Sequence, residues 1–114
     1  MTDYMNIYSE YLTLAIYSLK EKDYMKAEEC IKQAMYINPH SSVIHNLYGI
    51  LEEYLKDYNL ARKHYRASYA LDPTYNPAIR NLERISMLYL HDSSKQIDFG
   101  DKQEEDKPNP YVIL

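Results

Sequence analysis

Glycine and proline, the two residues that most often interrupt helices, are scarce in this chain. Its 114 residues include two glycines, Gly49 and Gly100, and five prolines. A glycine-rich loop of the kind that holds nucleotide phosphates needs several glycines close together, so the sequence excludes such a loop. With hydrophobic residues at 46%, the composition indicates a globular helical chain rather than a disordered one.

Cysteines and long apolar runs are equally rare. Cys30 is the single cysteine, which excludes an internal disulfide and favours a reducing compartment, so we expect a cytoplasmic location. No window of about 18 apolar residues occurs, so no membrane span is expected. The first residues, Met1-Thr2-Asp3-Tyr4, lack the basic region and the apolar run of a secretory signal.

An excess of basic residues is also lacking, since Asp and Glu outnumber Lys and Arg by 17 to 13. Residues 1–90 are nearly neutral, with 11 acidic and 10 basic side chains, and residues 91–114 carry most of the net negative charge. Because nucleic-acid phosphates require a stripe of Lys and Arg, the sequence argues against nucleic acid as a partner. The uneven charge also divides the chain into a helical domain, 1–90, and an acidic tail, 91–114, without helical periodicity.

No group of residues has the spacing of a metal or catalytic site. Cys30 follows Glu28 and Glu29, whose charges raise the pKa of a thiol and disfavour a catalytic nucleophile. No spacing among the four histidines places two ligands of one metal on a helix face: they are His40, His45, His64 and His91. We therefore expect no enzymatic activity, no cofactor and no metal.

What the chain does have is an internal repeat with a period of 34 residues. The matching residues are Lys22-Asp23-Tyr24 with Lys56-Asp57-Tyr58, Ala27 with Ala61, and Pro39 with Pro73. Five matches at one offset in so short a stretch are not expected by chance. Self-similarity at a fixed period of this length is the sequence signature of stacked repeat architectures.

The repeated residues resemble the tetratricopeptide pattern. That pattern has a large aromatic, then a Leu followed by a small residue, then an Ala paired with an aromatic four residues on, and a closing Pro. It falls here on Tyr11, Leu14-Ala15, Ala27 with Ile31, and Pro39, and again on His45, Tyr48-Gly49, Ala61 with Tyr65, and Pro73. The resemblance covers about residues 8–90 and is to a small, bacterial-type, single-domain member of this family.

The resemblance implies an all-α fold, an α-solenoid of two tetratricopeptide helix hairpins with a C-terminal capping helix. The two units span about 8–41 and 42–75, and the capping helix spans 76–90. Pro39 and Pro73 end the second helix of each unit because proline cannot continue a helix. The predicted helices are 3–20, 24–37, 42–55, 58–71 and 76–90. The residues predicted to cap the helices that follow them are Ser41, Ser42 and Asn76.

The fifth predicted helix ends the array because a third unit lacks its small residues. At the same offset the small positions fall on Glu83 and Lys95, and neither suits close helix packing. A terminal helix of a repeat array covers the last apolar face, so Glu83 is expected on the solvent side. The inward face is predicted to contain Ile79, Leu82 and Ile85, with Ser86 as a further candidate.

Stacks of tetratricopeptide hairpins bind other proteins. The resemblance therefore implies a protein–protein interaction module, adaptor or chaperone-like, that holds a peptide or protein segment in a concave groove. The residues predicted to face this groove lie three or four apart along the first helix of each unit and the capping helix. They are Leu12, Ile16, Leu19, Val43, Asn46, Ile50, Glu53, Tyr54, Arg80, Arg84 and Met87.

Within this groove Arg80 and Arg84, one turn apart, are predicted to grip a carboxylate together, while Asn46 holds a peptide backbone. The alternative is that both arginines are solvated. Some co-chaperones of the family hold the C-terminal carboxylate of heat-shock proteins with a clamp of Lys, Asn and Arg. Leu12, Ile16 and Leu47 occupy the matching positions here, which disfavours a heat-shock partner. Small bacterial secretion chaperones, which hold apolar segments, remain compatible with the sequence.

The end of the tail suggests a role in association. Tyr111-Val112-Ile113-Leu114 is an apolar terminus after an acidic linker, and we expect it to dock on a repeat surface, its own or a neighbour's. The alternative function for the chain is structural self-association without a separate peptide ligand. A homodimer would then form through this tail or through exposed Tyr and Leu side chains.

Overall fold

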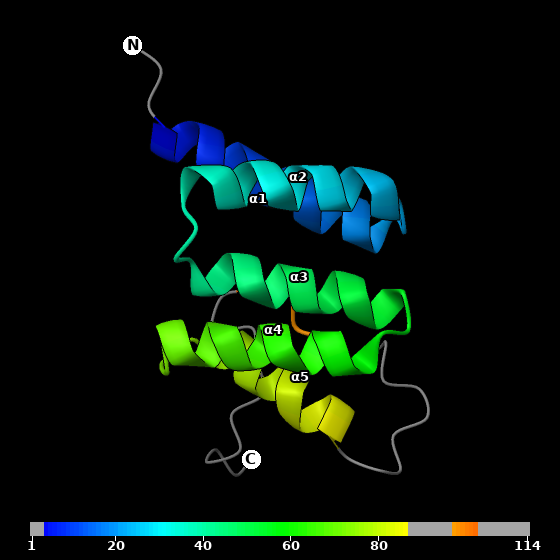
Figure 1. Ribbon diagram of the computed structural model, residues 1–114. Coiled ribbons are helices and arrows are strands. Elements are labelled where there is room, and N and C mark those ends of the chain that lie inside the picture. Colours follow the sequence, from blue (N-terminus) through cyan, green and yellow to red (C-terminus); the bar gives the residue numbers. More distant parts are fainter. Residues whose placement is uncertain (1–3, 87–96, 103–114) are drawn as a thin grey trace, which may run out of the picture.

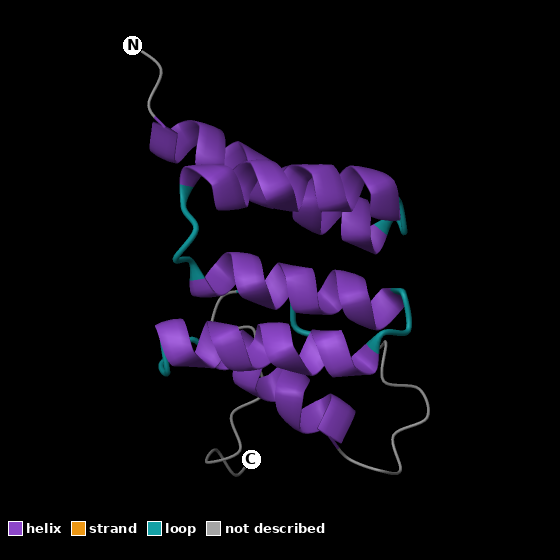
Figure 2. Ribbon diagram, in the orientation of Figure 1, coloured by secondary structure: helices purple, strands orange, loops and turns teal. Residues whose placement is uncertain are grey.

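The computed structural model describes residues 4–86 and 97–102 of the chain. These residues form five α-helices and contain no strand (Figure 2). The helices are α1 (Tyr4–Lys20), α2 (Tyr24–Ile37), α3 (Ser42–Tyr54), α4 (Tyr58–Leu71) and α5 (Asn76–Ser86). The all-α prediction is confirmed, and the first four helices agree with their predicted bounds to within one residue. The predicted end of the fifth helix, at residue 90, lies outside the described residues.

The helices follow one another in chain order from one end of the molecule to the other (Figure 1). Helix α1 packs against α2 and α3 against α4, while α2 contacts α3 and α4 contacts α5. Helix α3 also contacts α1 and α5, which makes it the central element. Within the described residues, no helix is long and apolar enough to cross a bilayer.

The helix ends before α2 and α4 have the same backbone conformation. Lys22 and Lys56 adopt the left-handed region, with φ values of 62° and 68°. The amide of the residue after each lysine donates to the carbonyl five residues earlier, at 2.8 and 2.9 Å, and the lysine amide donates to the carbonyl three residues earlier. This pattern is a Schellman motif, which satisfies the last carbonyls of a helix. The 34-residue sequence period is therefore present in the backbone as well.

Asp23 and Asp57 begin the next helices immediately after these motifs. One carboxylate oxygen of each aspartate accepts a hydrogen bond from the amide three residues on, at 3.2 Å for Asp23 and 3.1 Å for Asp57. An aspartate in this position satisfies one of the free amides of a first helical turn. The repeated Lys-Asp pair is thus a stop signal followed by a start signal. Ser41 does the same for α3, as predicted, by accepting from the amide of Ile44 at 3.3 Å.

Replacing Lys56 with glycine is expected to raise the free energy of unfolding by up to about 1 kcal/mol. A left-handed residue other than glycine costs about 1–2 kcal/mol, and the greater freedom of glycine in the unfolded chain offsets part of the gain. Chemical denaturation measures the change. The control is Lys63→Gly on the exposed side of α4, where the same residue should cost roughly 1 kcal/mol. A lower denaturation midpoint for Lys56→Gly than for the unaltered chain would contradict this prediction.

Small residues lie at the helix crossings that the repeat predicts. Ala15, Ala27 and Ala61 are completely buried. Gly49 is also buried, and a Cβ atom added to it would lie 2.5 Å from Cε1 of Tyr65. Backbones approach closely at these points because no larger side chain separates them.

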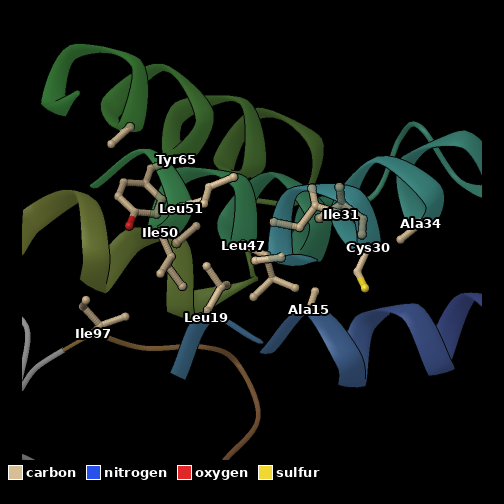
Figure 3. Close-up of a cluster of buried hydrophobic side chains, with 14 of the residues drawn as sticks. Ala15, Leu19, Cys30, Ile31, Ala34, Leu47, Ile50, Leu51, Tyr65 and Ile97 are labelled. Carbon is tan, nitrogen blue, oxygen red and sulfur yellow. The ribbon is translucent and has the colours of Figure 1, made fainter. Parts of the chain in front are cut away.

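The core joins apolar side chains of all five helices with one residue from beyond α5 (Figure 3). The largest fully buried apolar side chains are Leu19, Ile31, Ile44, Leu47, Ile50, Leu51 and Tyr65. Ile97 lies in the same cluster and is 9% exposed. A segment of the tail therefore contributes to the core.

The buried face of α5 differs from the prediction. Ile79, Leu82 and Ile85 are half-buried, whereas the most buried residues that follow Pro77 are Ala78, Asn81 and Arg84. The physical reason is that polar partners for the Asn81 and Arg84 side chains face this helix from α3 and from the segment that follows α5. Glu83 is exposed, as predicted, whereas Ser86, a candidate for the inward face, is also exposed.

Candidate functional site

Residues 97–102 follow α5 in the sequence and lie against the helices (Figure 1, orange). We call them the return segment. The peptide groups at Asp98 are held on both sides by asparagine side chains. The Asp98 carbonyl accepts from Nδ2 of Asn81 at 2.8 Å and from Nδ2 of Asn46 at 3.1 Å. The Asp98 amide donates to Oδ1 of Asn81 at 2.9 Å. These contacts recognise the main-chain amide and carbonyl, which every residue type except proline provides.

Asn46 on α3 and Asn81 on α5 act as one unit. Nδ2 of Asn81 also donates to Oδ1 of Asn46 at 2.8 Å, and both residues are completely buried. Asn46 was predicted from the sequence to hold a backbone, and the structure places it on a carbonyl of this chain. Asn81 was missed because the 34-residue offset from Asn46 falls on Arg80. The asparagine one place further on was the available signal.

Two ion pairs hold acidic side chains of the return segment. Nη1 of Arg80 lies 3.0 Å from a carboxylate oxygen of Asp98, whose side chain is 10% exposed. Nζ of Lys20 lies 2.6 Å from a carboxylate oxygen of Asp101 and 5.1 Å from the centre of the Phe99 ring. Lys20 thus contacts an acid and an aromatic ring at once, the latter as a cation–π contact.

The backbone of Gly100 lies directly against the side chain of Tyr75. Its φ of 78° lies in the left-handed region, and a Cβ atom there would lie 2.0 Å from Oη of Tyr75. Burial raises the pKa of Tyr75, and the charge of Asp98 raises it further. We call the five residues that receive the return segment the docking face. They are Lys20, Asn46, Tyr75, Arg80 and Asn81.

A buried ion pair supports the docking face from beneath. Arg84 donates from both terminal nitrogens to Glu53, at 2.5 and 2.7 Å, and the hydroxyl of Tyr65 donates to the same carboxylate at 2.8 Å. Both charged side chains are 4% exposed. Burial lowers the pKa of Arg84, but the hydrogen bonds and charge of Glu53 outweigh burial, so the pKa is raised. Arg84 also donates to Oδ1 of Asn81 at 3.2 Å, which turns Nδ2 of that amide toward Asp98.

The structure places the predicted groove residues in three environments. Asn46 and Arg80 contact the return segment. Leu19, Ile50, Glu53 and Arg84 are buried within the molecule. Leu12, Ile16, Val43 and Tyr54 are half-buried, and Met87 lies outside the described residues. The prediction that Arg80 and Arg84 share one carboxylate is wrong. Both terminal nitrogens of Arg84 donate to Glu53, so Arg80 pairs with Asp98 and Arg84 takes no part in that contact.

Tyr111 to Leu114, the tail residues predicted to dock, lie outside the described residues. The return segment was instead treated in the sequence as part of a polar linker. Its apolar residues, Ile97 and Phe99, alternate with Asp98, and this alternation was the available signal.

Within residues 4–86 and 97–102, no group of three or more His, Cys, Asp or Glu side chains is placed to hold a metal. Burial raises the pKa of the Cys30 thiol.

Two histidines that are distant in the sequence meet between α3 and α4. The Nδ1 atoms of His45 and His64 lie 3.4 Å apart. The Tyr48 ring stacks on the His64 ring, with the two ring centres 4.3 Å apart. Burial lowers the pKa of both imidazoles. The charge of His45 lowers the pKa of His64 further, whereas a hydrogen bond to the backbone of Pro39 acts in the opposite direction on His45.

The stability of the protein is expected to fall as the pH falls through the range just below 6.5. Because the folded-state pKa of His45 and His64 is lowered, the unfolded chain takes up protons first, and stability is greatest above that range. His64→Gln should flatten this dependence between about pH 7 and 5. Urea denaturation across that range checks it, with His40→Gln on an exposed residue as the control. Parallel slopes for the unaltered chain and His64→Gln would contradict the prediction.

No protein-family model, curated protein or solved structure matches the chain.

Proposed function

We propose that residues 1–90 are a tetratricopeptide-type domain, with α1–α2 and α3–α4 as two hairpins of a short α-solenoid and α5 as its cap. The support is that one offset of 34 residues recurs at three levels. It relates the left-handed Lys22 and Lys56, the capping Asp23 and Asp57, and the buried small residues of successive helix pairs. A sequence match alone would not require the same dihedral angles and caps.

We propose that this domain is a protein–protein interaction module, an adaptor or chaperone-like protein without enzymatic activity. In this proposal the docking face binds a segment of another protein in a reducing, cytoplasmic compartment. The observation that carries the proposal is that Asn46 and Asn81 form hydrogen bonds with the main-chain carbonyl and amide of Asp98. Because asparagine recognises the peptide group itself, the same two side chains suit a segment from another chain.

The test uses the full chain carrying Gly100→Val. A β-branched residue does not suit a φ of 78°, and its Cβ would collide with Tyr75. The return segment should therefore leave the docking face, although no residue of the docking face is substituted. A phage-displayed library of random peptides is then selected on this variant. We expect peptides with micromolar dissociation constants whose binding weakens about tenfold in Asn46→Ala, the loss of one hydrogen bond.

Asn59→Ala, at an exposed position of α4, is the matched control and should leave the affinities unchanged. Failure to select any peptide would remove the proposed function. So would peptides that bind Asn46→Ala and the unsubstituted face equally well.

Self-association is the second candidate function, and one observation favours it. Met25 and Tyr36 of α2 are 87% and 88% exposed, and a separation of eleven residues places them on one helix face. Large apolar side chains on a common face are typical of interfaces. Sedimentation equilibrium of the full chain tests this candidate. A dimer that Tyr36→Ser dissociates would support it, and a monomer at all concentrations would exclude it.

A further inference from the structure

We infer that the partner of the docking face is an acidic segment with the pattern aliphatic, Asp, aromatic, Gly, acidic, and that the return segment is the internal competitor it displaces. This inference rests on the proposed function and adds its specificity. The pattern is read from the five successive environments that the helices provide for residues 97 to 101, together with the peptide contacts of Asn46 and Asn81.

The first two environments select an aliphatic residue followed by aspartate. Ile97 belongs to the same buried apolar cluster as Leu19 and Ile50 (Figure 3), a place in which a charged residue would lose its hydration. Asp98 meets the guanidinium of Arg80 at 3.0 Å while its carbonyl and amide are held by the asparagines. A short acid satisfies both demands, because its carboxylate also accepts from the Gly100 amide at 2.9 Å.

The remaining three environments select an aromatic residue, glycine and a second acid. Lys20 lies over the ring of Phe99 and pairs with Asp101. Between them, Tyr75 leaves no space for a side chain at position 100, and the left-handed φ of 78° favours glycine there. Acids on both sides of the aromatic residue match the two cations of the face, so an acidic partner is favoured over a basic one.

Displacement by an outside segment is consistent with how the return segment is held. Both of its ion pairs reach solvent: Lys20 is 48% exposed and Arg80 40% exposed. A partner of the same pattern remakes these contacts one for one. In the sequence, ten residues separate Ser86 from Ile97, and a tethered segment at this sequence distance has an effective concentration of about 1 mM. A free peptide with a dissociation constant near 10 µM is therefore expected to bind the unaltered chain about 100-fold more weakly than an emptied face.

The probe is a fluorescein-labelled synthetic peptide with the sequence of residues 96–102, Gln-Ile-Asp-Phe-Gly-Asp-Lys. Fluorescence anisotropy measures its binding to the full unaltered chain and to the full chain with Gly100→Val. Asp98→Arg, which places two cations against each other, provides a second way to empty the face. Lys102→Val, at an exposed position, is the matched control and should bind as the unaltered chain does. Circular dichroism establishes that each variant stays helical.

We expect micromolar binding to Gly100→Val and Asp98→Arg, about 100-fold weaker binding to the unaltered chain, and weakening by added salt. A peptide with valine in place of its glycine should not bind. Three results would overturn the inference: no binding to helical variants, equal binding to the unaltered chain, or equal binding of a scrambled peptide. If library selection yields Asn46-dependent peptides of another pattern, the proposed function stands and this inference fails.

Discussion

Replacing Arg84 with methionine is expected to lower the free energy of unfolding by about 3–5 kcal/mol, because it leaves the charge of Glu53 buried without its counter-ion. Glu53 and Arg84 are each 4% exposed, and two of the hydrogen bonds to the carboxylate come from Arg84. The hydroxyl of Tyr65 is the third donor, and it does not neutralise the charge. Urea denaturation followed by circular dichroism measures the loss.

Two further variants separate the buried charge from the change in volume. Arg84→Met combined with Glu53→Gln should recover most of the lost stability, because glutamine is neutral and still accepts from Tyr65. Lys32→Met removes an exposed pair with Glu28 and should change stability little. If the double variant is no more stable than Arg84→Met, the loss comes from packing and not from the charge.

Gly49→Ala is expected to destabilise the protein by about 1–3 kcal/mol, although alanine is normally the better helix former. In an open helix this change gains about 1 kcal/mol. Here the new Cβ would lie 2.5 Å from Cε1 of Tyr65, a residue that is itself completely buried. The hydrogen bond from Tyr65 to Glu53 holds the ring in place, so overpacking outweighs helix propensity.

Thermal unfolding of Gly49→Ala, Tyr65→Leu and the double variant tests this explanation. Leucine at position 65 removes the ring atoms that the new methyl group would contact. The double variant should therefore lose less stability than the sum of the single variants, because the two sites interact directly. Strict additivity of the two losses would show that Gly49 and Tyr65 do not collide.

The helix bounds could be predicted from the sequence because local residues determine them. Pro39 and Pro73 cannot continue a helix, and Ser41 caps the next one within three residues. The buried positions of Ala27 and Ala61 followed from the repeat, since a period of 34 residues returns each to the same place in its helix pair. These features depend on neighbours within a turn or on a regular offset.

The polar side of α5 could not be predicted in the same way. The repeat placed Arg84 beside Arg80 in a groove, but the orientation of α5 directs Arg84 to Glu53, 31 residues earlier in the chain. A helical pattern shows which residues share a face, and it does not show which charges the opposite helix presents. The apolar residues Ile79, Leu82 and Ile85 were therefore assigned to the inward face, whereas Asn81 and Arg84 are buried there.

The sequence by itself determined the bounds of α1 to α4, which small residues pack at the helix crossings, and that the part of the chain the structure describes is all-α. The tertiary structure alone decided what lies on the docking face. Asn46 meets Asp98 across 52 residues of sequence, and Lys20 meets Asp101 across 81. Contacts at such separations follow from the relative positions of packed helices, and no local periodicity encodes them. The contacts of the return segment with Asn46 and Asn81 could therefore be identified only from the tertiary structure.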